Sequence, residues 1–402
     1  MKKLLLFLIC ANTLFVSGQN VTENKVSVNY IQLPTNVIAK QYVTYDIAIV
    51  RTYESANEDS LGLYQARLES AAAIHDAEMS SWKQIVHDMD RNYLAQMANW
   101  EKQTNSGTAA SVPQKPNYPN QPMMDDVKMP LLHTDLENFK VDKAVNLKGY
   151  TRGAGGALLT LEIFPISSMN IIESKSGEGP KIKYSYKCNY QMPIGVKIEV
   201  PGQGIVLQTI VSNGQSSYTM KSFSSKYEHQ LWLMDNQGQF WIDLEKSARN
   251  KALRQLNREV NDKCGFPVRN WATEVYTVKK FKAHVYTDLT NAYTMATQGY
   301  SKIHQSRDRK EAKAKLLQAI NAWKKILEES NIADSKSRVN DKVTALIQCN
   351  IAEAYIWLSL YDDAEKYINL VKSCRVNKFK RRGSVLDSLL KQRRLRWNSY
   401  FG

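Results

Sequence analysis

Hydrophobic and polar positions change their period along the chain, and each period predicts a different element. Apolar residues alternate over 26–53, which indicates strands. Farther along, apolar or aromatic residues and one histidine recur about every 3.6 residues without an intervening glycine or proline. They predict one long amphipathic helix over 60–103, or two nearly collinear ones, reaching about 60 Å. The stripe consists of Tyr64, Leu68, Ala72, His75, Met79, Trp82, Val86, Met89, Tyr93, Met97 and Trp100.

The segment that follows this helix, 104–130, is rich in proline. Five of the eleven prolines lie between 113 and 130. They predict an extended, mobile connection with local polyproline II character. A surface loop that returns the chain to its sheet is favoured over a ligand for a proline-recognition domain.

Short apolar runs separated by turn residues fill 139–286 and predict a mostly antiparallel sheet with one charged helix over 244–262. The stretch "YTRGAGGA" (150–157) has no Gly-Lys-Ser/Thr and precedes a strand, so it indicates a turn and not a phosphate-binding loop. The expected strands lie near 139–150, 157–164, 181–190, 195–200, 204–211, 229–234, 239–244 and 274–286.

Residues beyond Thr287 follow a helical period. The expected helices cover 288–305, 309–330, 337–359, 362–373 and 384–397. The chain therefore belongs to the α+β class, with β-rich N-terminal and middle regions, one long amphipathic helix and an all-α C-terminal region. The expected units are a signal peptide (1–18), an α+β domain (19–175) with the long helix and a proline-rich loop (104–130), a second α+β domain (176–287), a helical region (288–373) and a basic amphipathic tail (374–402).

The stretch "CNIAEAYIWLSLYDDAEKYINLV" (349–371) has the spacing of a tight helical hairpin. Ala352 and Ala364 are small where two helices cross closely, and Tyr355 and Ile368 are large beside them. This pattern resembles a tetratricopeptide repeat, and 296–327 contains a second, poorer match. The resemblance implies at most two repeats and a role in protein interaction or scaffolding; a helical cap that packs only on its own protein is the alternative.

The C-terminal tail is strongly basic. Ten Lys or Arg and one acid, Asp387, lie between Lys372 and Arg396. A row of leucines gives the tail an apolar side, so it predicts a basic amphipathic helix. Such a helix docks in an acidic partner groove, lies on anionic lipid, or simply covers the end of the helical region. The candidate contact residues are Lys380, Arg381, Arg382, Arg393, Arg394 and Trp397.

The first eighteen residues have the pattern of a secretory signal peptide. Lys2 and Lys3 precede a short apolar run, and Val16-Ser17-Gly18 offers a cleavage point before Gln19. The formal charge of +15 becomes +13 without the two lysines. In an exported protein this charge favours acidic protein faces or anionic membrane surfaces as partners over nucleic acid.

Four cysteines remain in the exported chain. An oxidising compartment permits the pairs Cys349–Cys374 and Cys188–Cys264. Four small buried hydrophobic residues are the favoured alternative.

No catalytic motif stands out, and no cofactor or metal site is expected. The chain has neither GxSxG nor HExxH, and His87 with Asp88 and Asp90 matches no metal spacing. We therefore expect a non-catalytic bacterial cell-envelope scaffold or adaptor, in the periplasm or at the periplasmic face of the outer membrane. The alternative is a periplasmic hydrolase or a glycan-binding β-module that uses Trp232 and Trp241.

Overall fold

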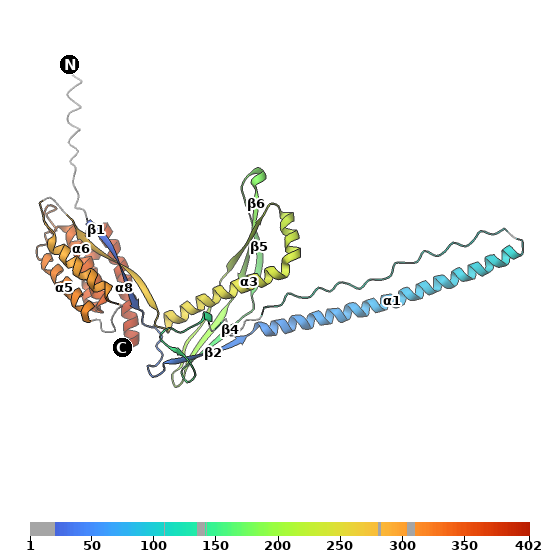
Figure 1. The fold of residues 1–402 in the computed structure, drawn as a ribbon, viewed down its shortest axis with the longest axis horizontal. Coiled ribbons are helices and arrows are strands. Elements are labelled where there is room, and N and C mark those ends of the chain that lie inside the picture. The colour runs from blue at the N-terminus through green and yellow to red at the C-terminus, as the bar shows by residue number, and fades with distance from the viewer. Residues whose placement is uncertain (1–20, 108, 135–140, 142, 280–282, 304–309) are drawn as a thin grey trace, which may run out of the picture.

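The computed structural model describes residues 21–107, 109–134, 141, 143–279, 283–303 and 310–402. The signal peptide expected at 1–18 lies outside these residues. The described chain forms a helical half, a middle part with two sheets and the helix α3, and a long projecting arm (Figure 1). The predicted α+β class is confirmed.

The arm consists of the helix α1 (Tyr53–Asn105) and the proline-rich segment that runs back along it. Trp100 Nε1 donates a hydrogen bond to the Ala110 carbonyl (3.1 Å), and Trp82 Nε1 donates to the Pro119 carbonyl (2.9 Å). The helix rises about 65 Å between Asn57 and Trp100, and a polyproline II strand rises about 71 Å between Ala110 and His133. The two segments therefore match in length.

The helix is longer at both ends than the predicted 60–103, and the predicted apolar stripe is its half-buried side. The proline-rich segment covers that side, so it lies along α1 instead of forming a free surface loop. Its carbonyls accept bonds from indole N–H groups, which suits a segment whose prolines have no N–H of their own.

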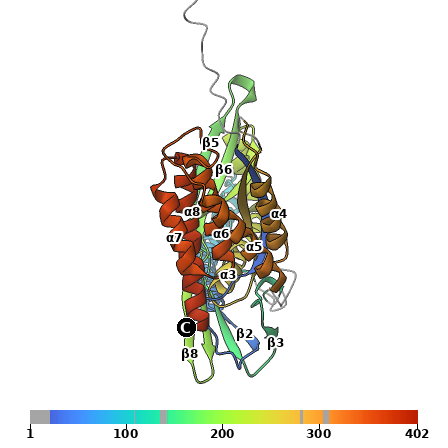
Figure 2. The same ribbon diagram turned by 90° about the vertical axis from the view of Figure 1, so that its left-hand side faces the viewer.

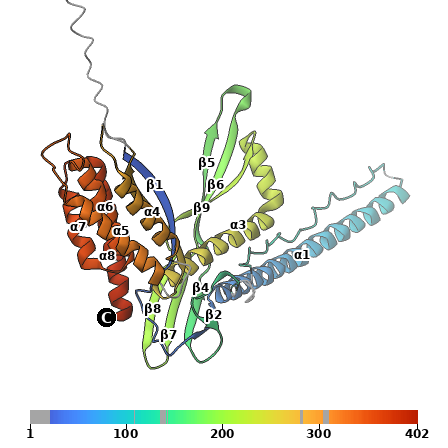
Figure 3. The same ribbon diagram turned by 60° about the vertical axis from the view of Figure 1, so that its left-hand side comes forward.

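Two sheets form the middle of the molecule (Figure 3). In the five-stranded sheet β2 runs parallel to β3 and β4, whereas β4, β7 and β8 are antiparallel. The three-stranded sheet is antiparallel, and α3 packs against β7, β8 and β9. The order of the five-stranded sheet is β3 (Thr151–Arg152), β2 (Thr44–Arg51), β4 (Ala157–Ile163), β7 (Ile194–Val200) and β8 (Gly204–Val211). The order of the three-stranded sheet is β5 (Ser167–Ser176), β6 (Lys183–Gln191) and β9 (Ser216–Phe223). The 3₁₀ turn η1 (Gly179–Lys181) precedes β6.

The helix α3 (Lys226–Lys263) replaces two expected strands, so the predictions at 229–234 and 239–244 are wrong. Ser225 begins the helix because its hydroxyl accepts the Glu228 N–H, while the Glu228 carboxylate accepts the Ser224 N–H. Gly238, one of the turn residues expected between those strands, is an open helical position where an added Cβ would meet nothing within 4 Å. A helix tolerates glycine there at a cost of about 1 kcal/mol.

The strand predicted over 139–150 is also wrong, because the described residues of that range form no strand. Two of their N–H groups bond to side chains of α3 instead of to a neighbouring strand. The Asn146 N–H donates to Asn257 Oδ1 (3.0 Å) and the Lys148 N–H to Asn261 Oδ1 (2.7 Å).

The helical half contains two antiparallel hairpins and the C-terminal helix, side by side in Figure 2. One shared core includes Trp323, Ala352, Ala364 and Phe379, so the C-terminal tail contributes to this core. Close crossings need glycine: a Cβ on Gly299 would lie 2.8 Å from the Leu316 side chain. The helices are α4 (Thr287–Ser301), α5 (Lys310–Leu327), α6 (Asp341–Trp357), α7 (Tyr361–Ser373) and α8 (Asn377–Phe401).

A two-stranded ribbon packs against these helices. The strand β1 (Val21–Ile31) pairs with β10 (Val268–Val278) in antiparallel register, and the ribbon contacts α4 and α6 (Figure 3). The N-terminal strand therefore belongs to the helical half and not to the sheet that follows it in sequence. The strand expected over 274–286 begins earlier and ends at Val278.

The packing of the proline-rich segment on α1 can be tested at Trp82. Trp82→Ala removes both the indole that packs against this segment and its bond to Pro119, so the segment should detach locally. We expect limited proteolysis with thermolysin to cleave between residues 110 and 131 several-fold faster. Leu94→Ala, which changes an exposed residue of the same helix, is the matched control. Equal cleavage rates in the two variants would contradict the packing.

Candidate binding pocket at the C-terminal helix

A hollow of about 260 Å³ lies where three segments meet. The end of β1 forms one wall, the turn between α6 and α7 a second, and the last turns of α8 the third. The residues that define this C-terminal pocket are Tyr30, Leu33, Tyr361, Leu389, Arg393, Arg396, Trp397 and Phe401.

Aromatic rings give the pocket its exposed apolar surface. The Trp397 and Phe401 rings lie 4.3 Å apart between centroids, and Tyr361 meets Trp397 edge to face at 6.2 Å. Trp397 is 36% exposed and Phe401 is 53% exposed. Rings held this way can receive an apolar or aromatic side chain at little cost in conformational entropy.

Two arginines form the rigid part of the wall. The Arg393 guanidinium stacks over Tyr30 (5.0 Å) and Trp357 (4.5 Å). Arg396 donates to the Leu33 carbonyl (2.9 Å) and to both the carbonyl (2.7 Å) and the carboxylate (3.0 Å) of Asp262. The charge of Arg396 is thus compensated, and the pocket is more suited to an apolar group than to an anion.

The ion pair with Arg396 also joins the helical half to the end of α3. Burial of Asp262 opposes ionisation, but the Gln32 hydrogen bond and the Arg396 charge together lower the pKa of this carboxyl. The carboxylate form is therefore the one that holds the two parts together.

The structure separates the six predicted contact residues into three groups, and the third consists of the buried Arg382 alone. Lys380 and Arg381 are exposed, and Arg394 pairs with Asp362 (3.1 Å) and Glu365 (2.9 Å) on α7. Arg393 and Trp397 lie in the C-terminal pocket, on the side of α8 that faces the core.

The predicted partner contact is wrong for Arg382, because this residue is buried and cannot contact a partner. Its Nη2 donates to Glu353 Oε2 at 2.6 Å, and its Nη1 lies 3.5 Å from Glu274 Oε2. The position shares the apolar side of α8 with Phe379 and Leu386, at helical spacing. Counting charge along the tail could not distinguish this arginine from its exposed neighbours.

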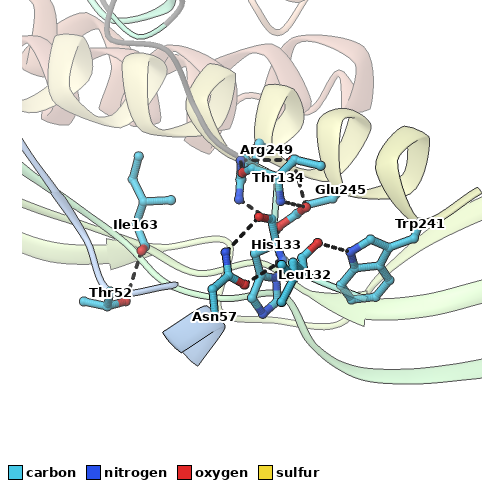
Figure 4. A network of polar contacts seen from close by, with 9 residues as sticks. All are labelled: Thr52, Asn57, Leu132, His133, Thr134, Ile163, Trp241, Glu245 and Arg249. Atoms are coloured by element: carbon cyan, nitrogen blue, oxygen red, sulfur yellow. Dashed lines mark hydrogen bonds and ion pairs between the residues drawn. The ribbon is translucent and has the colours of Figure 1, made fainter. Parts of the chain in front are cut away.

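A second cluster brings together residue types that enzymes use. Figure 4 shows Glu245 between His133, Thr134 and Arg249. Glu245 Oε1 accepts from His133 Nδ1 (3.0 Å) and Arg249 Nη2 (2.7 Å), while Oε2 accepts from the Thr134 N–H (2.7 Å) and hydroxyl (2.8 Å). Glu245 is 0% exposed, so its carboxylate is enclosed and not presented to a substrate.

We call this cluster the arm anchor, because it fixes both ends of the arm on α3. The amide of Asn57, near the start of α1, exchanges two hydrogen bonds with the His133 backbone (2.8 and 3.0 Å), and Trp241 Nε1 donates to the Leu132 carbonyl (2.9 Å). The anchor was not predicted from the sequence. The only local signal is the spacing of Glu245 and Arg249, which places them on one side of a helix.

The two tryptophans suggested for glycan binding do not form a β-platform. Both lie on α3, where Trp232 packs against Phe223 and Phe240 and Trp241 belongs to the arm anchor. The prediction that these two tryptophans lie on exposed strands is therefore wrong.

The four cysteines are free thiols in the structure. Cys188, Cys264 and Cys349 are buried and Cys374 is half-buried. Burial raises the pKa of Cys264 to about 12 and also raises that of Cys188, so the reactive thiolate form is disfavoured at both.

On the arm, Asp88 and Asp90, which neighbour His87 in sequence, each contact a different partner. Asp90 accepts a hydrogen bond from the Tyr118 hydroxyl, and Asp88 pairs with Arg91 (2.9 Å). Among the described residues, no three His, Cys, Asp or Glu side chains gather in a way that could hold a metal ion.

Within the same ranges, no helix has the length and apolar character needed to cross a bilayer. Comparisons of the chain with protein-family models, curated proteins and solved structures give no match.

The arm anchor predicts a large effect at Glu245. Glu245→Gln leaves Arg249 buried without its counter-charge, so the free energy of unfolding should fall by about 3–5 kcal/mol. The His133 and Thr134 hydrogen bonds lower the pKa of Glu245 despite its burial. Its contribution is therefore present above the unfolded pKa of about 4.3 and is lost as the pH falls through the lower folded value. Urea unfolding at pH 7 and at successively lower pH measures both effects.

Asp243→Asn is the matched control, since Asp243 is exposed on the same helix. It should change stability by less than about 0.5 kcal/mol. A Glu245→Gln variant as stable as this control would show that the anchor does not hold the arm.

Proposed function

We propose that the protein is a non-catalytic scaffold or adaptor of the bacterial cell envelope, which binds a protein partner at the C-terminal pocket. The observation that carries this proposal is the pair of exposed rings of Trp397 and Phe401, which lie beside the buried Tyr361 and the rigid wall of Arg393 and Arg396. Aromatic and arginine side chains in a hollow are typical of the centre of protein interfaces.

The surroundings of the pocket favour a protein ligand. Trp397 also borders a second, more polar hollow, of about 400 Å³, with Asp362, Asp363 and Arg394. An apolar centre beside charged residues that remain at the rim is the usual anatomy of a specific protein contact. Lys380 and Arg381, exposed near the start of the same helix, would complement an acidic partner surface.

The tetratricopeptide-like pattern supports the same class of function but at a different place. The β1–β10 ribbon packs against α4 and α6, so the chain itself covers a side of both hairpins. Partner binding is therefore proposed at the end of α8 and not in a groove of the repeat.

The proposed contact can be tested by substituting Trp397. Trp397→Ala should abolish recovery of a partner when the tagged full chain is crosslinked mildly in cells and purified from envelope extract. Leu395→Ala removes an apolar residue that is 60% exposed on the same helix but does not line the pocket, so it should leave recovery unchanged.

Equal recovery with both variants would rule out this pocket. A loss with the double variant Lys380→Glu/Arg381→Glu, but not with Trp397→Ala, would place the contact at the basic start of α8. Binding of the purified chain to anionic vesicles, lost in that double variant, would favour the lipid surface over a protein partner.

The proposed location is tested separately. We expect the chain in the periplasmic or outer-membrane fraction, with an N-terminus near Gln19 by Edman sequencing of the mature protein. Recovery from the cytoplasm with residues 1–18 intact would contradict export.

A further inference from the structure

The helix α1 carries a second apolar stripe, which the described chain leaves open. Leu63, Ile74 and Ile85 are 65%, 55% and 50% exposed. They recur every eleven residues, which is close to three helical turns, so they lie along one line of the helix. At about 100° per residue this line lies roughly a third of a turn from the side covered by the proline-rich segment.

Small residues lie between the three large ones. Ser70, Ala77 and Ser81 are exposed on nearly the same line and would let another helix approach closely. A hollow of about 390 Å³ opens beside Ile85, between this side of α1 and the proline-rich segment, with Ala77, Ser81 and Pro119 in its lining. The stripe therefore has both protruding and receding positions.

We propose that this stripe pairs with the same stripe of a second copy of the chain, in antiparallel orientation. Its equal spacing makes it self-complementary about Ile74. A two-fold axis at that residue brings Ile74 against Ile74 of the second copy, and Leu63 against Ile85 of the second copy. Each Leu63 then reaches the hollow beside the opposite Ile85. Such an interface is closed, because both copies use the same surface.

Charge distinguishes this orientation from a parallel one. Arg67 lies in line with Ile85, five helical turns before it, and Glu78 lies beside the same line. Both are exposed, and neither forms an ion pair within the described part of the chain. The antiparallel register brings Arg67 within about 4.5 Å, along the helix axis, of Glu78 of the second copy. A parallel register would place like charges opposite each other at both positions. The antiparallel register also brings Asp59 opposite Asp88 of the second copy. This Asp88 already pairs with Arg91 of its own chain.

The placement of the arm permits this pairing. Figures 1 and 3 show α1 leading away from both sheets and from the helical half. The proline-rich segment lies on a different side of the helix, so a second arm can run along the open stripe without displacing it.

Single cysteines test the register in the full-length chain. Ile74→Cys should form a disulfide-linked dimer under mild oxidation, because Ile74 faces itself. Leu63→Cys and Ile85→Cys should each stay monomeric on a non-reducing gel, since each would be about 33 Å from its own equivalent. A mixture of these two variants should form a crosslinked dimer. The unsubstituted chain controls for the native cysteines.

The position of the crosslink decides the outcome. A crosslink of Leu63→Cys to itself would show parallel pairing and overturn the proposal, as would equal crosslinking of all three single variants. Light scattering after size exclusion should give twice the chain mass at tens of micromolar for the unsubstituted protein. Ile74→Asp should give the single mass with an unchanged circular dichroism spectrum. A single mass for the unsubstituted protein would refute the pairing.

Discussion

The position of the arm depends on one buried carboxylate. Glu245 accepts hydrogen bonds or ion pairs from His133, Thr134 and Arg249, and these contacts hold residues 132–134 on α3. The start of α1 joins the same place through Asn57. Because α1 has 53 residues and rises about 80 Å, a small rotation at its base would move its far end by a large distance. The stiffness of the base therefore decides whether the arm can present a surface in a fixed direction.

The helical half uses the same kind of interaction in a different setting. Glu353 is 1% exposed and accepts from Arg382 and from Trp271 Nε1 (3.0 Å), so α6, α8 and β10 share one buried charge pair. Nearby, the Asn350 amide accepts the Tyr276 N–H (2.9 Å) and donates to its carbonyl (2.8 Å). One side chain of α6 thus bonds both backbone groups of Tyr276, on the edge of β10 that does not pair with β1. These polar contacts fix the ribbon on the helices in one register, where apolar packing alone would be less specific.

Sequence periodicity was informative wherever one side of an element is buried along its whole length. The stripe from Tyr64 to Trp100 is the half-buried side of α1, and the strands β4, β7 and β8 follow their apolar runs. Prediction failed where short apolar runs have no unique period. The first turns of α3 contain Trp232, Phe240 and Trp241 at spacings that suit a strand or a helix, and the helical choice depends on a cap at Ser225 and on packing against two sheets.

In the candidate site too, spacing along one helix could be read from the sequence, whereas contacts between distant segments could not. The spacing of Phe379, Arg382, Leu386, Arg393 and Trp397 already placed both arginines on the apolar side of α8, a signal that a simple count of charges concealed. The other walls of the C-terminal pocket come from the end of β1 and the turn between α6 and α7, and the partner that holds Arg396 in place, Asp262, lies at the end of α3. The end of β1 and Asp262 are far from α8 in sequence. No local pattern could bring Tyr30 beside Arg393, because that contact requires the β1–β10 pairing first.

Arg396 links the two proposed surfaces, the C-terminal pocket and the arm, through α3. This arginine lines the pocket and bonds to Asp262, which lies on the same helix as Glu245. A single continuous α3 therefore connects the wall of the C-terminal pocket to the anchor of the arm, without a flexible linker between them. Partner binding at one end and pairing of arms at the other would be held in a fixed relative geometry, which is the mechanical property that a scaffold needs and that two domains on a flexible tether lack.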